Sequence, residues 1–399
     1  MLGRIINNIK GDKYIWYIVA ILSAVSLLLV YSSTRSLAYK NEHGNTEYYL
    51  LRHGFILGVG LFITYVVHRI DHRYFSRIAQ MMLILSVPLL LYTKFFGVRI
   101  NDASRWVRIP LVGLTFQSSD FAKLALIMYT SRMLSKKQGV IKDIKEVVLH
   151  IMLPVVIICG LIMLDNFSSA GILFATCIVV LFIGRVSTKF ILTIGAGGFI
   201  MAASIFAFSW FFVKDHGRAD VWIQRIENWR NPDVNSDDFY QQKQAYIAIA
   251  KGGLFRIAPG KSTQCNFLPD AFSDFIYSTL IEEYGLVGGA FVLFLYLFFM
   301  WRLIILVKNS PRAFGALMAV GLGVSMVLQA IIHMGVNVHL LPNTGITLPL
   351  ISWGGTSIWF NAFALGIILS VSRHVEEREK STITSPIKEK KKVVDEIHG

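Results

Sequence analysis

The sequence predicts an all-α polytopic membrane protein with about ten transmembrane helices and one large extracytoplasmic loop between helices seven and eight. Of its 399 residues, 54% are hydrophobic and only 16% are charged, whereas a soluble domain carries about 25% charged residues. Its mean hydropathy is +0.55. This composition excludes an ordinary soluble enzyme, a disordered protein and a coiled coil. The three cysteines lack the spacing of a disulfide framework or a zinc site.

A membrane-spanning helix needs about 20 mostly apolar residues, because lipid offers no partner to an unpaired backbone group. Only Asp165 and Asn166 separate the fifth such run of this chain from the sixth. The first run is too long for a cleavable signal peptide, and no cleavage site of small residues follows it. The ten runs lie at residues 14–31, 53–68, 78–93, 116–134, 147–164, 168–185, 190–212, 275–307, 313–336 and 354–373.

The distribution of basic residues predicts the orientation of the chain. With the N-terminus inside, the inner segments carry 23 Lys and Arg residues and the short outer loops carry 7. This bias predicts both termini in the cytoplasm. The formal net charge of +14 then reflects topology and contact with anionic lipid rather than nucleic-acid binding. We expect a cytoplasmic N-terminus (1–13), a membrane domain (14–373) with its large loop at 213–274, and a charged, disordered cytoplasmic tail (374–399).

Charged residues inside apolar runs are expensive to bury and are functional candidates for that reason. Asp120 and Lys123 lie three residues apart in the fourth run, which places them on one helix face. Glu282 and Glu283 lie near the start of the eighth run. Two interpretations remain open. Either Lys123 neutralises one of these acids and fixes helix packing, or the charges belong to a functional site.

The large outer loop (213–274) contains eight basic and eight acidic residues, so it is not a basic arm. Its aromatic residues suit a layer against lipid headgroups. Residues 240–251 have the composition of a helix that Gly252 and Gly253 would end. The loop is therefore either a folded cap over a site or an anchor on the lipid surface.

The end of this loop carries the strongest catalytic candidate. Pro269 interrupts the chain, and Ser273 or Asp274 is expected to open the eighth helix. Asp274 is then either an N-cap carboxylate that binds the free N–H groups of the helix start, or a carboxylate at the outer membrane interface. In the second case it would act as a general base on a lipid-linked substrate.

Residues 341–357 contain two prolines and three glycines between apolar runs. This composition predicts an irregular re-entrant or interfacial turn. Such backbone is tolerated at membrane depth only where it is buried in protein or lines a cavity. The simpler alternative is a tight outer loop with ordinary turn residues.

Four segments, in this order along the chain, resemble motifs of the SEDS family of polytopic membrane glycosyltransferases, and the resemblance covers roughly residues 14–373. Two segments depart from the family pattern: residues 256–262 lack two glycines of GxGxGxS, and residues 164–169 replace QPDxGT. The matching segments are 116–124 (FQPSEFAKL in the family, with 101–106 similar to its NGARRW lead-in), 240–253 (YQxxQSxxAIxxGG), 267–284 (LPExxxDFIFAxxxEExG) and 341–357 (PxTGxxLPFxSxGGSS).

The resemblance implies a peptidoglycan glycosyltransferase that polymerises lipid II into glycan strands on the outer face of the bacterial cytoplasmic membrane. The segments FQSSDFAKLALIMY and DNFSSAGILF are more similar to the division branch, FtsW, than to the elongation branch, RodA, which implies a place at the division septum. The family's catalytic carboxylate corresponds to Asp274. It would take the proton of the acceptor 4-hydroxyl while the acceptor oxygen displaces undecaprenyl pyrophosphate from the donor.

The resemblance also implies substrate-binding residues. Lys123 and Arg225 would stabilise the pyrophosphate leaving group, whereas Arg105 and Arg256 are expected to be solvated loop charges. The remaining substrate-binding candidates in the matched segments are Gln241, Gln244, Ser262, Glu282, Thr344, Ser352, Gly354 and Gly355.

The implied partners are lipid II, membrane lipids, a class B penicillin-binding transpeptidase and other division proteins, with no nucleic acid. A divalent cation, Mg²⁺ or Mn²⁺, could assist the leaving group, although Lys or Arg could do the same work. Two other functions remain open. One is a lipid II flippase that uses Asp120, Lys123 and Glu282 as a path, and the other is a scaffold without catalysis that recruits division proteins.

Overall fold

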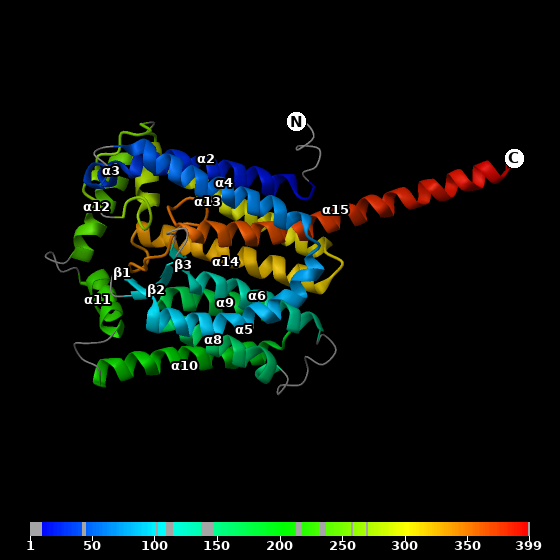
Figure 1. Cartoon of the computed structure of the whole chain (residues 1–399), viewed down its shortest axis with the longest axis horizontal. Coiled ribbons are helices and arrows are strands. Elements are labelled where there is room, and N and C mark those ends of the chain that lie inside the picture. The colour runs from blue at the N-terminus through cyan, green and yellow to red at the C-terminus, as the bar shows by residue number, and fades with distance from the viewer. Residues whose placement is uncertain are drawn as a thin grey trace.

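A computed structural model of the chain describes residues 10–41, 45–100, 103–108, 115–136, 147–212, 218–231, 237–256, 258–268 and 270–397. In it the chain forms a bundle of long helices whose axes are roughly aligned, with a small sheet at one end (Figure 1). We call this end the sheet end. The opposite end, where the last helix leaves the bundle, is the tail end.

Ten helices of the bundle coincide with the ten predicted apolar runs, so the multi-pass α-helical fold is confirmed. Six of them are long and apolar enough to cross a membrane: α2, α4, α5, α13, α14 and the first part of α15. Two further apolar helices, Val148–Met163 and Phe167–Ile183, are shorter. The ten helices are α2 (Lys13–Ser33), α4 (Thr46–Arg69), α5 (His72–Phe96), α6 (Ser118–Lys136), α8 (Leu153–Met163, preceded by the π-helical turn Val148–Met152), α9 (Phe167–Ile183), α10 (Thr188–Phe212), α13 (Ile276–Asn309), α14 (Ala313–Asn337) and α15 (Thr356–Ile397).

Short polar breaks between the apolar runs determine where several helices begin. The side chain of Asn166 accepts a hydrogen bond from the Ser169 amide at 3.1 Å, so the break between the fifth and sixth runs is the N-cap of α9. Asp12, Asn45 and Asp71 cap α2, α4 and α5 in the same way. Each cap satisfies backbone N–H groups that the helix itself leaves free.

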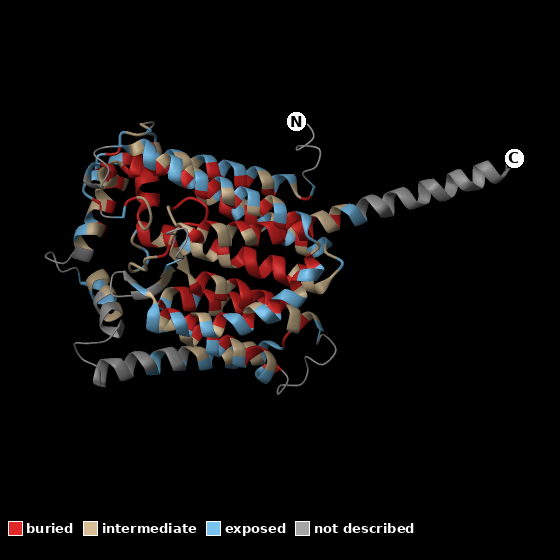
Figure 2. Ribbon diagram, in the orientation of Figure 1, coloured by how far each residue is buried: buried red, intermediate tan, exposed pale blue. Residues whose placement is uncertain are grey.

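The core lies between the central helices. Figure 2 shows buried residues concentrated on the inner helices and exposed residues on the outer faces of the bundle. The apolar segments of α14 and α15 are 78% and 67% buried, compared with 28% for α5. The outer helices therefore present apolar side chains outwards, as expected of a surface that contacts lipid.

The sheet was not predicted. Its three short strands are β1 (Val98–Ile100), β2 (Ala103–Arg108) and β3 (Thr115–Gln117), which pair antiparallel in the order β1-β2-β3. Trp106 is the partner of Gln117 in the second pair. The strands are too short to give a sequence pattern distinct from the apolar runs on either side. They can be identified only from their pairing in the structure.

Helix α13 is not the regular span that the sequence suggested. Gly285 has φ = 71° and ψ = −179°, which breaks the helical path between Tyr284 and Leu286. The amide of Leu286 donates to the Gly253 carbonyl at 2.9 Å, so the preceding loop satisfies the interrupted backbone. A Cβ at Gly285 would lie 2.5 Å from the Leu254 carbonyl oxygen, which explains why glycine stands at this position.

The described part of the large outer loop is folded and contains helices. It contains α11 (Arg218–Arg230), α12 (Asp237–Gly252) and a 3-10 turn (Gln264–Asn266), while the short helix α3 (Arg35–Asn41) follows α2. The predicted helix at 240–251 is thus confirmed by α12. The Trp229 indole donates to the His339 carbonyl at 3.1 Å, and Tyr246 bonds to the His339 ring, so α11 and α12 both contact the chain after α14.

The sequence predicts a disordered tail, whereas in the structure α15 continues as one helix to Ile397 (Figure 1). The Glu, Lys and Arg residues of this segment are good helix formers. Two described residues that precede α2 contact this helix at the tail end. Lys10 pairs with Glu377 at 3.1 Å, and the Gly11 amide donates to Glu376 at 2.8 Å.

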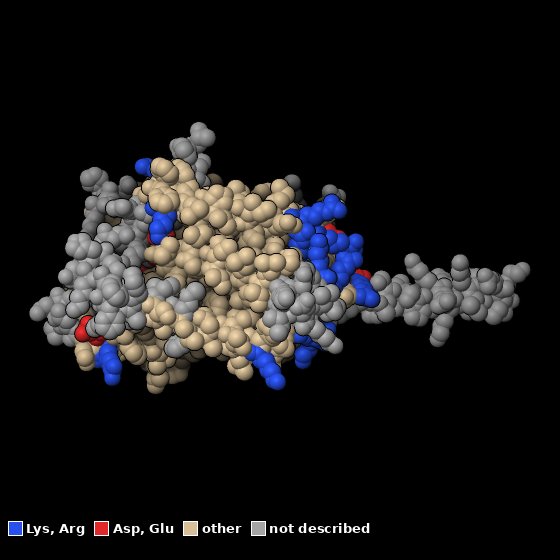
Figure 3. All heavy atoms as spheres, turned by 90° about the horizontal axis from the view of Figure 1, so that it is seen from below, with Lys and Arg blue, Asp and Glu red and all other residues tan. Residues whose placement is uncertain are grey.

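Charged side chains are concentrated at the ends of the bundle. Figure 3 shows Lys and Arg gathered at the tail end, near the point where α15 leaves, and a wide, mostly uncharged belt between the two ends. This arrangement is the one expected of a multi-pass membrane protein. It agrees with the positive charge predicted for the segments at that end.

Helices α4 and α15 pack closely because small residues lie between them, and Gly366 is the clearest case. A Cβ at Gly366 would lie 2.6 Å from the Cβ of Val67. We expect Gly366→Ala to destabilise the protein by about 1–3 kcal/mol through overpacking. The readout is the thermal unfolding midpoint in detergent.

The matched control is Gly171→Ala in α9, where nothing lies within 4 Å of the added Cβ. This change should be neutral or stabilising by up to about 1 kcal/mol, since Ala is the better helix former. Equal midpoints for the two variants would contradict the close approach of α4 and α15.

Candidate active site

A cavity of about 430 Å³ opens at the sheet end. The residues that line it come from α4, β2, β3, α6, α9, α11, α14 and α15, from the residues before α13, and from the segment Leu341–Gly355, which we call the Pro/Gly segment. Segments from most of the chain therefore meet here. The volume falls in the range of about 300–1,000 Å³ that is usual for small-molecule sites.

Asp274 lines this cavity. Helix α13 begins at Ile276 with Phe275 in the N-cap position and no side-chain cap, so the expectation that Asp274 is the N-cap is wrong by one residue. The Asp274 carbonyl accepts from the Asn337 side chain at 3.0 Å, and the Ser273 hydroxyl donates to Asp274 Oδ1 at 3.2 Å. A buried amide thus fixes the backbone that presents the carboxylate to the cavity.

The Pro/Gly segment is irregular, as predicted, and lies against the cavity. Gly345 and Gly355 have φ of +61° and +51°, which glycine adopts without strain. Side chains of neighbouring helices form hydrogen bonds with four of its carbonyl groups. The bonds join Gln329 to the Thr347 carbonyl (2.9 Å), His333 to that of Ile346 (2.7 Å), Tyr296 to that of Pro349 (2.5 Å) and Ser26 to that of Ile351 (2.8 Å).

Two further bonds join the Pro/Gly segment to the residues directly before Asp274. The Ser352 hydroxyl donates to the Ser273 carbonyl at 2.7 Å, and the Trp353 amide donates to the Phe272 carbonyl at 2.9 Å. The Ser352 hydroxyl also accepts from the Leu348 amide at 2.8 Å. The position of the carboxylate is therefore coupled to the fold of this segment.

Three cationic side chains line the same cavity. Lys123 Nζ lies 2.6 Å from Asp120 Oδ1, and the two side chains are only 14% and 10% exposed. Arg225 Nη1 donates to the Asn343 carbonyl at 3.5 Å, while its buried Nε has no hydrogen-bond partner in the described part of the chain. The guanidinium of Arg52 lies 5.9 Å from the centre of the Trp353 ring.

Three carboxylates line the cavity: Asp120, Asp270 and Asp274. Asp120 is already paired with Lys123. Desolvation by the surrounding chain raises the pKa of Asp270 above its ordinary value, which makes it a second candidate for a proton acceptor. In the described residues, the three carboxylates do not form a cluster close enough to hold a metal ion by themselves.

The structure brings five of the residues predicted for the site to this cavity and leaves the other six outside its walls. Thr344 and Ser352 belong to the Pro/Gly segment but do not line the cavity, and Gln241 and Gln244 lie on α12. The five residues that line it are Asp274, Lys123, Arg225, Gly354 and Gly355.

Ser262 and Glu282 lie outside the cavity and are buried. The Glu282 carboxylate accepts from the Ser262 hydroxyl, from the Thr263 amide at 3.0 Å and from the Gln264 amide at 3.3 Å. Glu283 accepts from the Ser262 amide at 3.3 Å and from the Ser32 hydroxyl. These contacts hold the loop before Asp274 against α13. They give the two buried carboxylates a structural role.

Sequence reasoning missed several residues of the cavity, above all Arg52, Trp106, Gln329 and Trp353. Arg52 lies just before a predicted apolar run, where the sequence alone indicates only a loop charge. Of the two disfavoured arginines, Arg256 donates to the Lys251 carbonyl at 3.0 Å and lies outside the cavity. The side chain of Arg105 lies outside the described part.

Comparison with known proteins gives consistent matches over most of the chain. A family model described as cell cycle protein, FTSW_RODA_SPOVE, matches residues 12–377. The "Probable peptidoglycan glycosyltransferase FtsW" of Hydrogenovibrio crunogenus is 32% identical over 90% of this chain and 91% of its own length. That of Nitrosococcus halophilus is 33% identical over 91% and 92%.

Solved structures match the fold. A chain from "Structural coordination of polymerization and crosslinking by a peptidoglycan synthase complex" has a TM-score of 0.72 and 24% identity, with 92% of this chain and 98% of that chain covered. The rod shape determining protein RodA of Thermus thermophilus has a TM-score of 0.64 at 24% identity, with 91% and 97% covered.

The Asp120–Lys123 pair predicts a non-additive effect on stability. Asp120→Asn or Lys123→Met alone leaves the other charge poorly compensated inside the bundle, and we expect each to cost about 3 kcal/mol. The double variant should recover most of this loss because no unpaired charge remains. Thermal unfolding of the four proteins completes the cycle, and additive losses would show that the two side chains do not depend on each other.

Proposed function

The chain belongs to the FtsW/RodA/SpoVE family of cell cycle proteins, and we infer that it is a peptidoglycan glycosyltransferase that polymerises lipid II into glycan strands during cell division. The observation that carries this proposal is the meeting of Asp274, Lys123 and Arg225 around one cavity. These side chains are distant in sequence. A carboxylate and cations in one cavity suit the transfer of a sugar from a pyrophosphate.

We assign Asp274 as the general base. It takes the proton of the acceptor 4-hydroxyl, and the acceptor oxygen then attacks the anomeric carbon of the donor sugar. A new carbon–oxygen bond forms as the bond to undecaprenyl pyrophosphate breaks, with inversion at that carbon. Asp120 suits this role less well because Lys123 already neutralises it at 2.6 Å.

The leaving pyrophosphate gains negative charge and needs cationic stabilisation. Lys123 and Arg225 supply it, and Arg52 is a third cation that lines the cavity. The unpartnered Nε of Arg225 supports this role, because it leaves a donor available for phosphate oxygen. The glycines 354 and 355 let backbone approach the substrate closely.

A divalent cation fits this cavity only together with substrate. Mg²⁺ is commonly held by one or two carboxylates plus substrate phosphates, and Asp270 or Asp274 with the pyrophosphate would provide such a set. Mg²⁺ or Mn²⁺ bound in this way would add positive charge beside the leaving group. Lys123 and Arg225 perform the same neutralisation from the protein itself.

We further propose that the sheet end faces the cell exterior and that both termini lie in the cytoplasm. The excess of Lys and Arg in the segments at the tail end supports this orientation (Figure 3). The contact between Lys10 and Glu377 supports termini on one side. As part of the division machinery, the protein would act at the septum.

The proposed partner is a class B penicillin-binding transpeptidase, which would cross-link the new strand. Its support is a similar chain that comes from a complex described as coordinating polymerisation and cross-linking. Coupling the two reactions would place the growing strand, as it leaves the cavity, within reach of the second enzyme.

The assignment of Asp274 predicts the behaviour of three variants in lipid II polymerisation by purified protein. Asp274→Asn should lower the rate by about 10²–10⁴-fold, the usual contribution of a general base. Asp270→Asn tests the second carboxylate of the cavity and should lower it less than about 10-fold. Glu227→Gln, an exposed carboxylate of the same outer loop, should have no effect.

Normal polymerisation by a folded Asp274→Asn variant would reject Asp274 as the base, and a large loss in Asp270→Asn alone would transfer the role to Asp270. Translocation of lipid II across vesicles without polymer would favour the flippase. Division supported in cells by Asp274→Ala would favour the scaffold.

A further inference from the structure

A cluster of possible metal ligands lies at the tail end, whereas the cavity lies at the sheet end. It consists of Asp71 and His72, at the start of α5, and His374 on α15, whose ligand atoms all lie within 4.8 Å of one another. Among the described residues it is the one group of three such side chains with this geometry. We propose that these residues form a binding site for a divalent transition-metal ion of the zinc type.

The first argument is the state of His72. Its side chain is buried, with 2% of its surface exposed, and its Nδ1 has no hydrogen-bond partner in the described part of the chain. This atom lies 3.5 Å from Asp71 Oδ1. A buried, unpartnered ring nitrogen is costly, and a metal ion between it and the carboxylate removes that cost.

The second argument is distance. Zn²⁺ binds His nitrogen and carboxylate oxygen at about 2.0–2.2 Å in tetrahedral geometry, so two of its ligands lie about 3.4 Å apart. The separation of 3.5 Å between His72 and Asp71 fits one edge of such a site. His374 is the third ligand of the proposed site: its ring centre lies 5.0 Å from that of His72, and its ligand atom lies within 4.8 Å of the other two.

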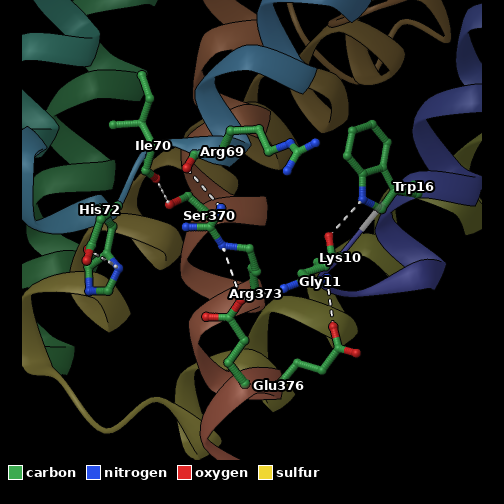
Figure 4. A network of polar contacts seen from close by, with 11 residues as sticks. Lys10, Gly11, Trp16, Arg69, Ile70, His72, Ser370, Arg373 and Glu376 are labelled. Carbon is green, nitrogen blue, oxygen red and sulfur yellow. Dashed lines mark hydrogen bonds and ion pairs between the residues drawn. The ribbon is translucent and has the colours of Figure 1, made fainter. Parts of the chain in front are cut away.

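The third argument is that the fold holds these residues in place. Figure 4 shows that α15 bonds to the turn before His72: the Ser370 hydroxyl donates to the Ile70 carbonyl, and Arg373 donates to the Arg69 carbonyl at 2.9 Å. Gly315 of α14 lies behind the His72 ring, where a Cβ would be 3.2 Å from its Nε2. Three helices thus fix His72 and the backbone beside Asp71.

Two arginines near the cluster, Arg73 and Arg312, oppose a cation. Arg73 lies 3.4 Å from Asp71 Oδ2 but is 57% exposed, so water screens its charge. Arg312 also interacts electrostatically with His72. Two imidazoles and one carboxylate suit Zn²⁺ and its neighbours rather than Mg²⁺ or Ca²⁺. The bound ion would join α15 to the turn between α4 and α5.

The test is Zn²⁺ binding by the full-length protein in detergent micelles, measured by isothermal titration and by the thermal unfolding midpoint. We expect one Zn²⁺ per chain and a midpoint that rises with Zn²⁺ but not with Mg²⁺. His374→Gln should weaken binding at least 10-fold, since it removes one of three ligands without touching the core. His150→Ala, a histidine outside the cluster, should change binding less than 2-fold.

Co²⁺ provides a second measurement that does not depend on stability. Its visible spectrum should show a nitrogen- and oxygen-bound ion in the unaltered protein and in His150→Ala, but not in His374→Gln. Equal Zn²⁺ binding by the unaltered protein and His374→Gln would overturn the proposal. A midpoint that rises with inorganic phosphate or anionic-lipid vesicles, but not with Zn²⁺, would also overturn it and indicate an anion site formed by the arginines.

Discussion

The carbonyl groups of the Pro/Gly segment must be satisfied by protein, because lipid supplies no donors at membrane depth. Ser26, Tyr296, Gln329 and His333 provide these donors from α2, α13 and α14. Once they hold the segment, Ser352 holds the backbone next to Asp274. The proposed base is therefore positioned by the same bonds that make irregular backbone tolerable inside the bundle.

The helices could be predicted from the sequence because the signal for each one lies within its own residues. An apolar run of sufficient length has one stable structure in lipid, and polar breaks such as Asn166 mark its limits. Lys123 could be selected because a charge inside an apolar run is costly and rare, whereas Arg225 was implied by the family resemblance, and Asp274 by that resemblance and by its place at the start of the eighth run. Their meeting in one cavity was a hypothesis that depended on tertiary structure.

Other features depend on contacts that no local pattern reveals. Arg52 and Trp353 reach the cavity because α4 packs beside α15. The sequence of neither helix predicts which other helix it packs against. Glu282 was a candidate site residue because it is an acid in an apolar run, yet its carboxylate accepts hydrogen bonds from loop amides. The same cost of burial thus selects structural and functional carboxylates alike.

The break at Gly285 separates two parts of α13 that would otherwise move as one rod. A helix that spans a bilayer changes its tilt when the hydrocarbon layer becomes thicker or thinner. The short first part, which begins at Ile276, is held by Asn337 and by the outer loop, whose Ala258 amide donates to the Glu283 carbonyl at 2.9 Å. Gly285 is the point where the backbone leaves the helical path, so no continuous helix transmits a change in tilt of the long second part to the residues beside Asp274.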